Sequence, residues 1–188
     1  MDEEKVVAIS FKYKDIYSMS DLYGMARLWL DEEGFTNTEL SVPENFMETF
    51  YLERTDQLSG KEYWIWWRPH KIINNYIKLK LDIDYHVLGM TDIEIMHKGK
   101  KIKIQQGETE MFFTGKILTD WNNKWQNSPI MKYLEPFFRK QIYKKELEKI
   151  EIEFRKTIYR FHQAMKDYLE MKTYFQKELP ITPARGKA

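Results

Sequence analysis

The chain has 188 residues, with 30 Lys or Arg against 29 Asp or Glu, so its formal net charge is +1. It contains no cysteine, which excludes disulfide bonds, thiol catalysis and cysteine-ligated metals. No apolar run approaches the roughly 18 residues of a membrane span, and the acidic N-terminus is unlike a targeting signal. We therefore expect a cytoplasmic protein with a single α+β domain over residues 1–176 and a flexible tail over residues 177–188.

The chain opens with a pattern typical of one strand and one helix. Residues 7–13 alternate between apolar and small or polar side chains, which predicts a strand. Ser18 and Asp21 then have the spacing of a helix capping box, and apolar residues from Leu22 to Leu30 recur at helical intervals. Gly34 stands where such a helix ends.

Residues 36–120 have the pattern of β-structure. The clearest strand is 77–87, where apolar residues at odd positions alternate with polar residues at even positions. The alternation continues past Ile93 and resumes at Ile102, which predicts a hairpin with Gly99 in its turn. Weaker strands are expected at 46–53, 61–67 and 108–119.

The last third of the chain predicts a long amphipathic helix. From Tyr143 to Leu169, apolar residues recur every three or four positions. A helix beginning near Pro136 and running from about Phe137 to Phe175 would be roughly 58 Å long. Because a ten-residue strand is only about 33 Å long, we expect this helix to bend, break or project past the sheet.

This order of elements resembles the helix-grip fold of the START-like (SRPBCC) superfamily. The resemblance covers about residues 6 to 172 and concerns element order, with no short motif behind it. It implies an antiparallel sheet wrapped around a long C-terminal helix, with a cavity between them for lipids, sterols or other apolar ligands. Some members of that superfamily are cyclases or hydratases, and others are protein-interaction domains. The length of the C-terminal helix and the single helical segment after the first strand depart from the pattern.

The sequence carries no motif for nucleotide binding, serine hydrolysis or zinc proteolysis. The most chemical-looking feature is a polar stripe in the predicted strand 77–87, which includes Asp82, Asp84 and His86. Three consecutive side chains on one face of a straight strand converge poorly on one ion, so we interpret the stripe as a solvated face with cross-strand charge pairs. We expect no catalytic residue, metal or cofactor, which favours a non-enzymatic protein and leaves an enzyme open.

The aromatic content suggests a first hypothesis for function. Phe, Trp and Tyr make up 29 of the 188 residues, and aromatic side chains dominate the lining of apolar pockets. The first hypothesis is a non-enzymatic domain that holds an apolar or amphipathic ligand, such as a lipid, between sheet and long helix. The ligand contacts expected are Trp64, Trp66, Phe113, Tyr143, Phe154 and Phe161.

Two alternatives remain open. The first is a nucleic-acid or ribonucleoprotein-associated module, in which Lys98, Lys100, Lys101 and Lys103 of the predicted hairpin bind phosphates. The second is a protein-interaction or oligomerisation domain that uses the protruding end of the long helix.

Overall fold

The computed structural model describes residues 2–35, 47–58, 60–97 and 100–169. In this part of the chain, six strands form one antiparallel sheet, and three α-helices and one π-helical turn accompany it. The α+β class expected from the sequence is confirmed. In chain order the elements are β1 (Asp2–Tyr17), α1 (Met19–Glu32), β2 (Glu48–Asp56), β3 (Gly60–Trp67), β4 (His70–Ile72), β5 (Ile77–His97), β6 (Lys100–Thr119), α2 (Met131–Phe137), the π-helical turn η1 (Phe138–Ile142) and α3 (Lys144–Tyr168).

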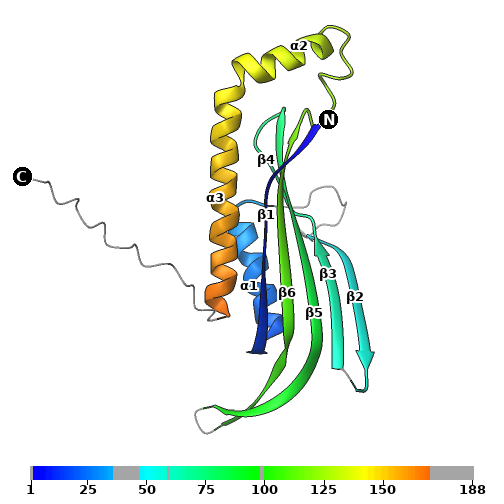
Figure 1. Cartoon of the computed structure of the whole chain (residues 1–188), viewed down its shortest axis with the longest axis vertical. Helices are drawn as coiled ribbons and strands as arrows, with labels where there is room; N and C mark the ends of the chain where they lie inside the picture. The colour runs from blue at the N-terminus through cyan, green and yellow to red at the C-terminus, as the bar shows by residue number, and fades with distance from the viewer. Residues whose placement is uncertain (1, 36–46, 59, 98–99, 170–188) are drawn as a thin grey trace, which may run out of the picture.

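The sheet has the strand order β1-β6-β5-β3-β2, and β4 pairs with β5 off this path. The predicted hairpin is present as β5 and β6, although Gly99 of its turn lies outside the described residues. The register of this hairpin shifts between Leu88 and Thr91. Beyond that irregularity, the end of the hairpin bends toward the side on which the helices lie (Figure 1).

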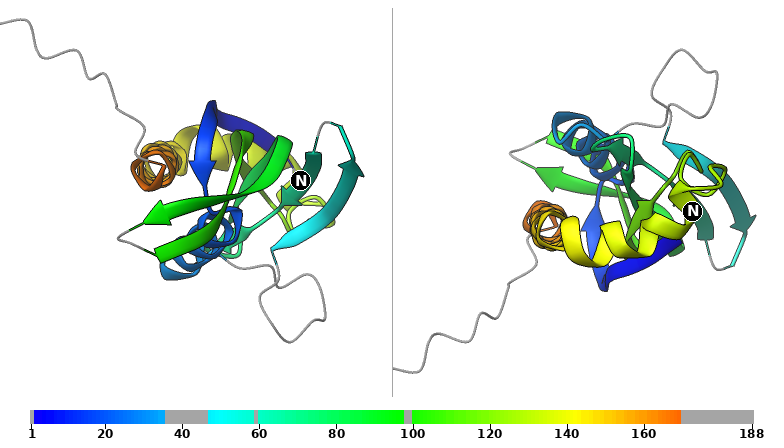
Figure 2. Two further views of the ribbon diagram at one scale, coloured as in Figure 1. Left: turned by 90° about the horizontal axis from the view of Figure 1, so that it is seen from below. Right: turned by 90° about the horizontal axis from the view of Figure 1, so that it is seen from above.

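Residue pairing across the strands defines two faces of the sheet. Ile65, Tyr85 and Met111 are cross-strand neighbours and are almost completely buried. Trp64 and His86 are neighbours on the opposite face. Helices α1 and α3 pack on the first face, which we call the inner face, and lie side by side there (Figure 2).

The start of α1 follows from local chemistry. The Ser18 side chain accepts a hydrogen bond from the Asp21 backbone N–H, which satisfies one of the unpaired donors at a helix N-terminus. Leu22, Ala26 and Leu30 are fully buried, so the predicted apolar stripe is the stripe that packs on the core.

Helix α3 packs directly on the sheet. Its side chains Phe154, Ile158 and Phe161 are at most 2% exposed. Below them, Gly115 leaves room for the helix, since a Cβ atom at this position would lie 2.2 Å from the Ile158 Cδ1 atom. A larger residue at position 115 would either push the helix away from the sheet or force Ile158 into a strained rotamer.

The C-terminal helix begins later than the sequence suggested and is broken. Pro136 lies in the last turn of α2, where it removes one helical N–H. The chain then forms η1, in which the Tyr143 N–H donates to the Phe138 carbonyl five residues earlier at 2.8 Å. The expectation of a helix starting near Phe137 is thus corrected to α3 at Lys144–Tyr168. The expected tail at 177–188 lies outside the described residues.

Candidate functional site

Three of the six expected ligand contacts are core residues. Phe113 and Phe161 are completely buried, Phe154 is 2% exposed, and the rings of Phe113 and Phe161 meet edge to face at 5.4 Å. These residues fill the interface between the sheet and α3. Their area stabilises the fold, and they offer no surface to a ligand.

Trp64 and Trp66 lie on the outer face, away from both helices. Trp64 stacks on His86 with ring centroids 3.7 Å apart, and Trp66 stacks on Phe50 at 4.3 Å. The Arg68 guanidinium lies 5.7 Å from the Trp66 ring centroid. Because neighbouring residues of a strand point to opposite faces, these tryptophans are separated from the residues beneath α3.

Tyr143 lies at the junction of η1 and α3. Its hydroxyl accepts a hydrogen bond from the Asn74 side chain at 2.8 Å, and its ring stacks on Phe138 at 5.3 Å. Through the hydrogen bond to Asn74, Tyr143 fixes the end of η1 to the loop before β5. The structure therefore does not bring the six expected contacts together in one site.

The lysines proposed for phosphate binding are only partly described. Lys98 lies outside the described residues, and Lys100 is placed in β6 without a described side chain. Lys101 and Lys103 are exposed, but Glu94 pairs directly with Lys103 across the hairpin and lies 3.9 Å from the Lys101 ammonium. This carboxylate offsets part of the charge that a phosphate would need.

A pocket that the sequence analysis did not foresee lies on the inner face between the first turn of α1 and strands β2 and β3. Its volume is about 410 Å³. We call it the tyrosine pocket, because three tyrosine rings dominate its lining. It is lined by Met19, Ser20, Tyr23, Glu48, Tyr51, Tyr63, Ile65 and Gln105.

Hydrogen bonds fix two walls of the tyrosine pocket. The Tyr23 hydroxyl donates to Glu48 Oε2 at 2.6 Å, which joins α1 to the start of β2. The Gln105 side-chain oxygen accepts from the Met19 backbone N–H at 3.1 Å, which joins β6 to the start of α1. The Tyr23 ring also packs edge to face on Trp67 at 4.6 Å. These contacts tie α1 to β2, β3 and β6 around the pocket.

The electrostatics of the tyrosine pocket favour neutral phenols beside a carboxylate. Burial and the hydrogen bond to Glu48 raise the pKa of Tyr23 well above its usual value. Burial and the nearby Glu53 carboxylate raise the pKa of Tyr51 to about 12. Glu48 is the one charged side chain among the residues that line the pocket. An occupant would therefore meet aromatic faces, hydroxyl groups and one negative charge.

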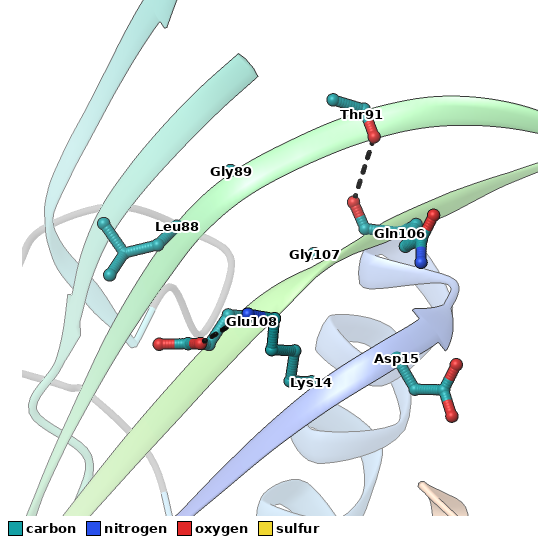
Figure 3. Close-up of a pocket in the computed structure, with 8 residues that line it drawn as sticks. All are labelled: Lys14, Asp15, Leu88, Gly89, Thr91, Gln106, Gly107 and Glu108. Atoms are coloured by element: carbon teal, nitrogen blue, oxygen red, sulfur yellow. Dashed lines mark hydrogen bonds and ion pairs between the residues drawn. The ribbon is translucent and has the colours of Figure 1, made fainter. Parts of the chain in front are cut away.

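A second hollow, of about 610 Å³, lies at the bend of the β5–β6 hairpin (Figure 3). Figure 3 shows Lys14 and Glu108 side by side there, and Asp15 pointing away. The Lys14 ammonium lies 3.7 Å from a Glu108 carboxylate oxygen. The Thr91 hydroxyl donates to the Gln106 carbonyl at 3.4 Å. The Lys14 ammonium, the Glu108 carboxylate and the Thr91 hydroxyl are already paired within this hollow, so it is a weaker candidate than the tyrosine pocket.

The polar stripe on β5 pairs its charges across strands, as interpreted from the sequence. Asp82 lies 3.0 Å from the Lys116 ammonium, and Asp84 lies 2.6 Å from the Arg68 guanidinium. His86 lies 3.2 Å from the Glu62 carboxylate. In the described part of the chain, no group of three or more acidic or histidine side chains could hold a metal ion.

Tyr23, Glu48, Tyr51 and Gln105 were not expected from the sequence as site residues. Tyr23 lies in α1, where the dominant pattern is that of the apolar residues that form the core stripe of the helix. Tyr51 lies in a strand that the sequence predicted only weakly. One signal was available: Tyr63 alternates with Trp64 and must face the other side of its strand. The local pattern could not show which side faces the helices.

Comparisons of the whole chain with known protein families, curated proteins and solved structures found no match.

Proposed function

We propose that this protein is a non-enzymatic binding domain for a small amphipathic molecule seated in the tyrosine pocket. The ligand's apolar body would lie against the rings of Tyr23, Tyr51 and Tyr63, with a protonated amine directed at Glu48. The observation that carries this proposal is a hollow with an aromatic lining and one carboxylate. Ligand pockets commonly combine a mostly apolar wall with a few fixed polar groups.

The proposal moves the ligand from the place first expected. The interface beneath α3 is filled by Phe113, Phe154 and Phe161, whereas the inner face beside α1 keeps a hollow. A volume of about 410 Å³ is suited to a ligand of one ring and a short chain. A long lipid would leave much of its tail in water.

The charge and the rings of the pocket together favour a cation over an anion. The faces of tyrosine rings carry negative potential and attract ammonium groups within about 6 Å. Glu48 adds a full negative charge, and the nearby Glu53 is balanced by Lys61 at 3.2 Å. An acidic head group would meet Glu48 as a like charge.

The test compares phenethylamine with 3-phenylpropionate by isothermal titration calorimetry on the full chain. The two probes share an aromatic body and differ in the charge of the head group. We expect phenethylamine to bind and 3-phenylpropionate to bind at least tenfold more weakly. Equal binding of the two probes, or no binding of the amine, would contradict the proposal.

Variants locate the binding. Glu48→Gln should weaken phenethylamine binding about tenfold, because a charge-assisted hydrogen bond is replaced by a neutral one. Tyr51→Ala should weaken it several-fold, whereas Tyr159→Ala should leave it unchanged. Tyr51 and Tyr159 are both 50% exposed, so the two variants remove the same side chain at the same exposure, inside and outside the pocket.

A further inference from the structure

Helix α2 presents a group of large apolar side chains to solvent. In Figure 1 this helix lies at one end of the molecule, turned away from the axis of α3. Tyr133 is 82% exposed and Phe137 is 60% exposed, although both are bulky aromatic residues. We call the group the α2 apolar patch. It consists of Ile130, Met131, Tyr133, Leu134, Phe137 and Ile142.

The exposure of this patch follows from how α2 is anchored. Glu135 is buried and accepts a hydrogen bond from the Tyr76 hydroxyl at 2.6 Å. Phe138 packs on Trp125 at 4.7 Å and on Tyr76 at 5.6 Å. One side of α2 is thus fixed to the fold. The other side of the helix carries four exposed residues with the spacing of one helical face: Ile130, Tyr133, Leu134 and Phe137.

The segment that carries the patch is strongly basic. Residues 121–145 contain six Lys or Arg and a single acidic residue, Glu135. Since Glu135 is buried against Tyr76, no acidic side chain of this segment is exposed. Lys124, Lys132 and Lys145 are exposed and form no ion pair with any described residue. The remaining described cations of the segment, Arg139 and Lys144, pair with Asp2, Glu4 and Glu148.

We propose that the α2 apolar patch docks on the surface of an anionic lipid bilayer. The apolar side chains would enter the boundary between head groups and acyl chains, and the unpaired lysines would contact the anionic head groups. This is surface attachment, since no described helix is long and apolar enough to cross a membrane. The proposal is independent of the tyrosine pocket.

The composition of the patch argues against two other occupants. A second copy of the chain would place Lys132 and its neighbours opposite the same lysines, because a two-fold interface brings identical surfaces together. A nucleic acid would stack its bases on exposed rings, and only Tyr133 and Phe137 supply rings here, whereas the other four patch residues are aliphatic and offer a base no stacking surface. A lipid surface accepts aliphatic side chains and supplies the negative charge.

The test measures sedimentation of the full chain with vesicles of phosphatidylcholine alone and with about 30% phosphatidylserine. We expect binding to the anionic vesicles that is at least tenfold tighter than binding to the neutral ones. Binding should weaken as salt rises from about 0.1 to 0.5 M, because the lysine contribution is screened. No binding to anionic vesicles, or equal binding to both kinds, would overturn the proposal.

Variants distinguish binding through the α2 apolar patch from non-specific binding through any exposed apolar residue. Leu134→Glu with Phe137→Glu should reduce vesicle binding more than tenfold. The control pair Ile152→Glu with Leu28→Glu should leave vesicle binding unchanged. Ile152 and Leu28 are 54% and 64% exposed, close to the 52% of Leu134 and the 60% of Phe137. Equal losses in both pairs would contradict the assignment to α2.

A last pair of measurements tests the charge and the second-copy alternative. Lys132→Ala should weaken binding about fivefold, and Lys156→Ala on α3 should not. Light scattering of the free protein should show no dimer dependent on the patch. A dimer abolished by the patch variant, together with absent vesicle binding, would assign the surface to a second copy and overturn the proposal.

Discussion

Replacing Gly115 by alanine tests whether α3 packs directly on the sheet. The added methyl carbon would lie 2.2 Å from Ile158 Cδ1, 3.1 Å from Phe154 Cε1 and 3.2 Å from Val7 Cγ1. Ile158 is completely buried and Phe154 nearly so, so neither side chain can turn into solvent. The methyl group can be accommodated only by shifting α3 or by forcing a strained rotamer on Ile158.

The size of the effect follows from overpacking. Extra methyl groups in well-packed cores cost about 1–3 kcal/mol, and we expect Gly115→Ala in the upper half of this range. For a chain of this length, each kcal/mol lowers the Tm by about 2–4 °C. Ile158→Val removes the clashing Cδ1 atom and alone should cost about 0.5–1.5 kcal/mol. The double variant should therefore be more stable than the sum of the single effects predicts.

Urea unfolding followed by circular dichroism measures these free energies. Gly24→Ala is the matched control, since Gly24 lies in α1 and, beyond its chain neighbours and the backbone of its own helix, no atom lies within 4 Å of the added methyl group. That variant should stabilise the protein by about 0.5–1 kcal/mol through helix propensity. If Gly115→Ala is neutral, or if its effect adds fully to that of Ile158→Val, the reasoning about this interface is refuted.

Two further predictions concern buried polar groups. Tyr76→Phe removes the donor to the buried Glu135 carboxylate and should cost about 1–3 kcal/mol in urea unfolding, whereas Tyr133→Phe should be silent because Tyr133 is 82% exposed. A neutral Tyr76→Phe would contradict this role. Burial and Lys166 lower the pKa of His162 below its usual value of 6.5, so the unfolded chain binds the proton first and stability falls as the pH drops below that value. The unfolding free energy of His162→Gln should therefore fall less than that of the wild type between about pH 7 and pH 5, and equal slopes would refute the assignment.

The fold could be predicted best from the sequence where a local pattern was compatible with only one buried face. In residues 77–87 polar and apolar side chains alternate, which predicts one buried face, and burial follows that alternation from Leu79 to Val87, whereas Lys78 on the polar face is also buried. In residues 63–67 every side chain is apolar, so alternation alone could not choose a face. The choice depends on pairing with β5, where Trp66 lies opposite Asp84 and Trp67 lies opposite Ile83.

The start of the long helix shows a different limit. Helical spacing of apolar residues begins at Tyr143, and α3 begins at Lys144. The length of a helix from Phe137 led us to expect a bend, a break or a projection, but not where it would fall, and the helix is interrupted by η1 at Phe138–Ile142. The π-helical turn instead lets the rings of Phe138 and Tyr143 both pack on Tyr76, a tertiary contact that spacing cannot reveal.

The tyrosine pocket could not be predicted for a related reason. Tyr23 comes from α1, Glu48 from β2 and Gln105 from β6, and each is unremarkable in its own segment. The register between β2 and β3 and the packing of α1 bring them together. The choice of six aromatic contacts was based on ring size alone, and large rings serve the core as often as they serve a ligand.

The most direct test of the proposed binding site is a ¹H–¹⁵N nuclear magnetic resonance titration of the full chain with phenethylamine. We expect the largest shifts on the backbone amides of Tyr23, Tyr63, Ile65 and Gln105, around the tyrosine pocket. Shifts centred on Phe113 and Phe161 would place the ligand beneath α3 and contradict the proposed site.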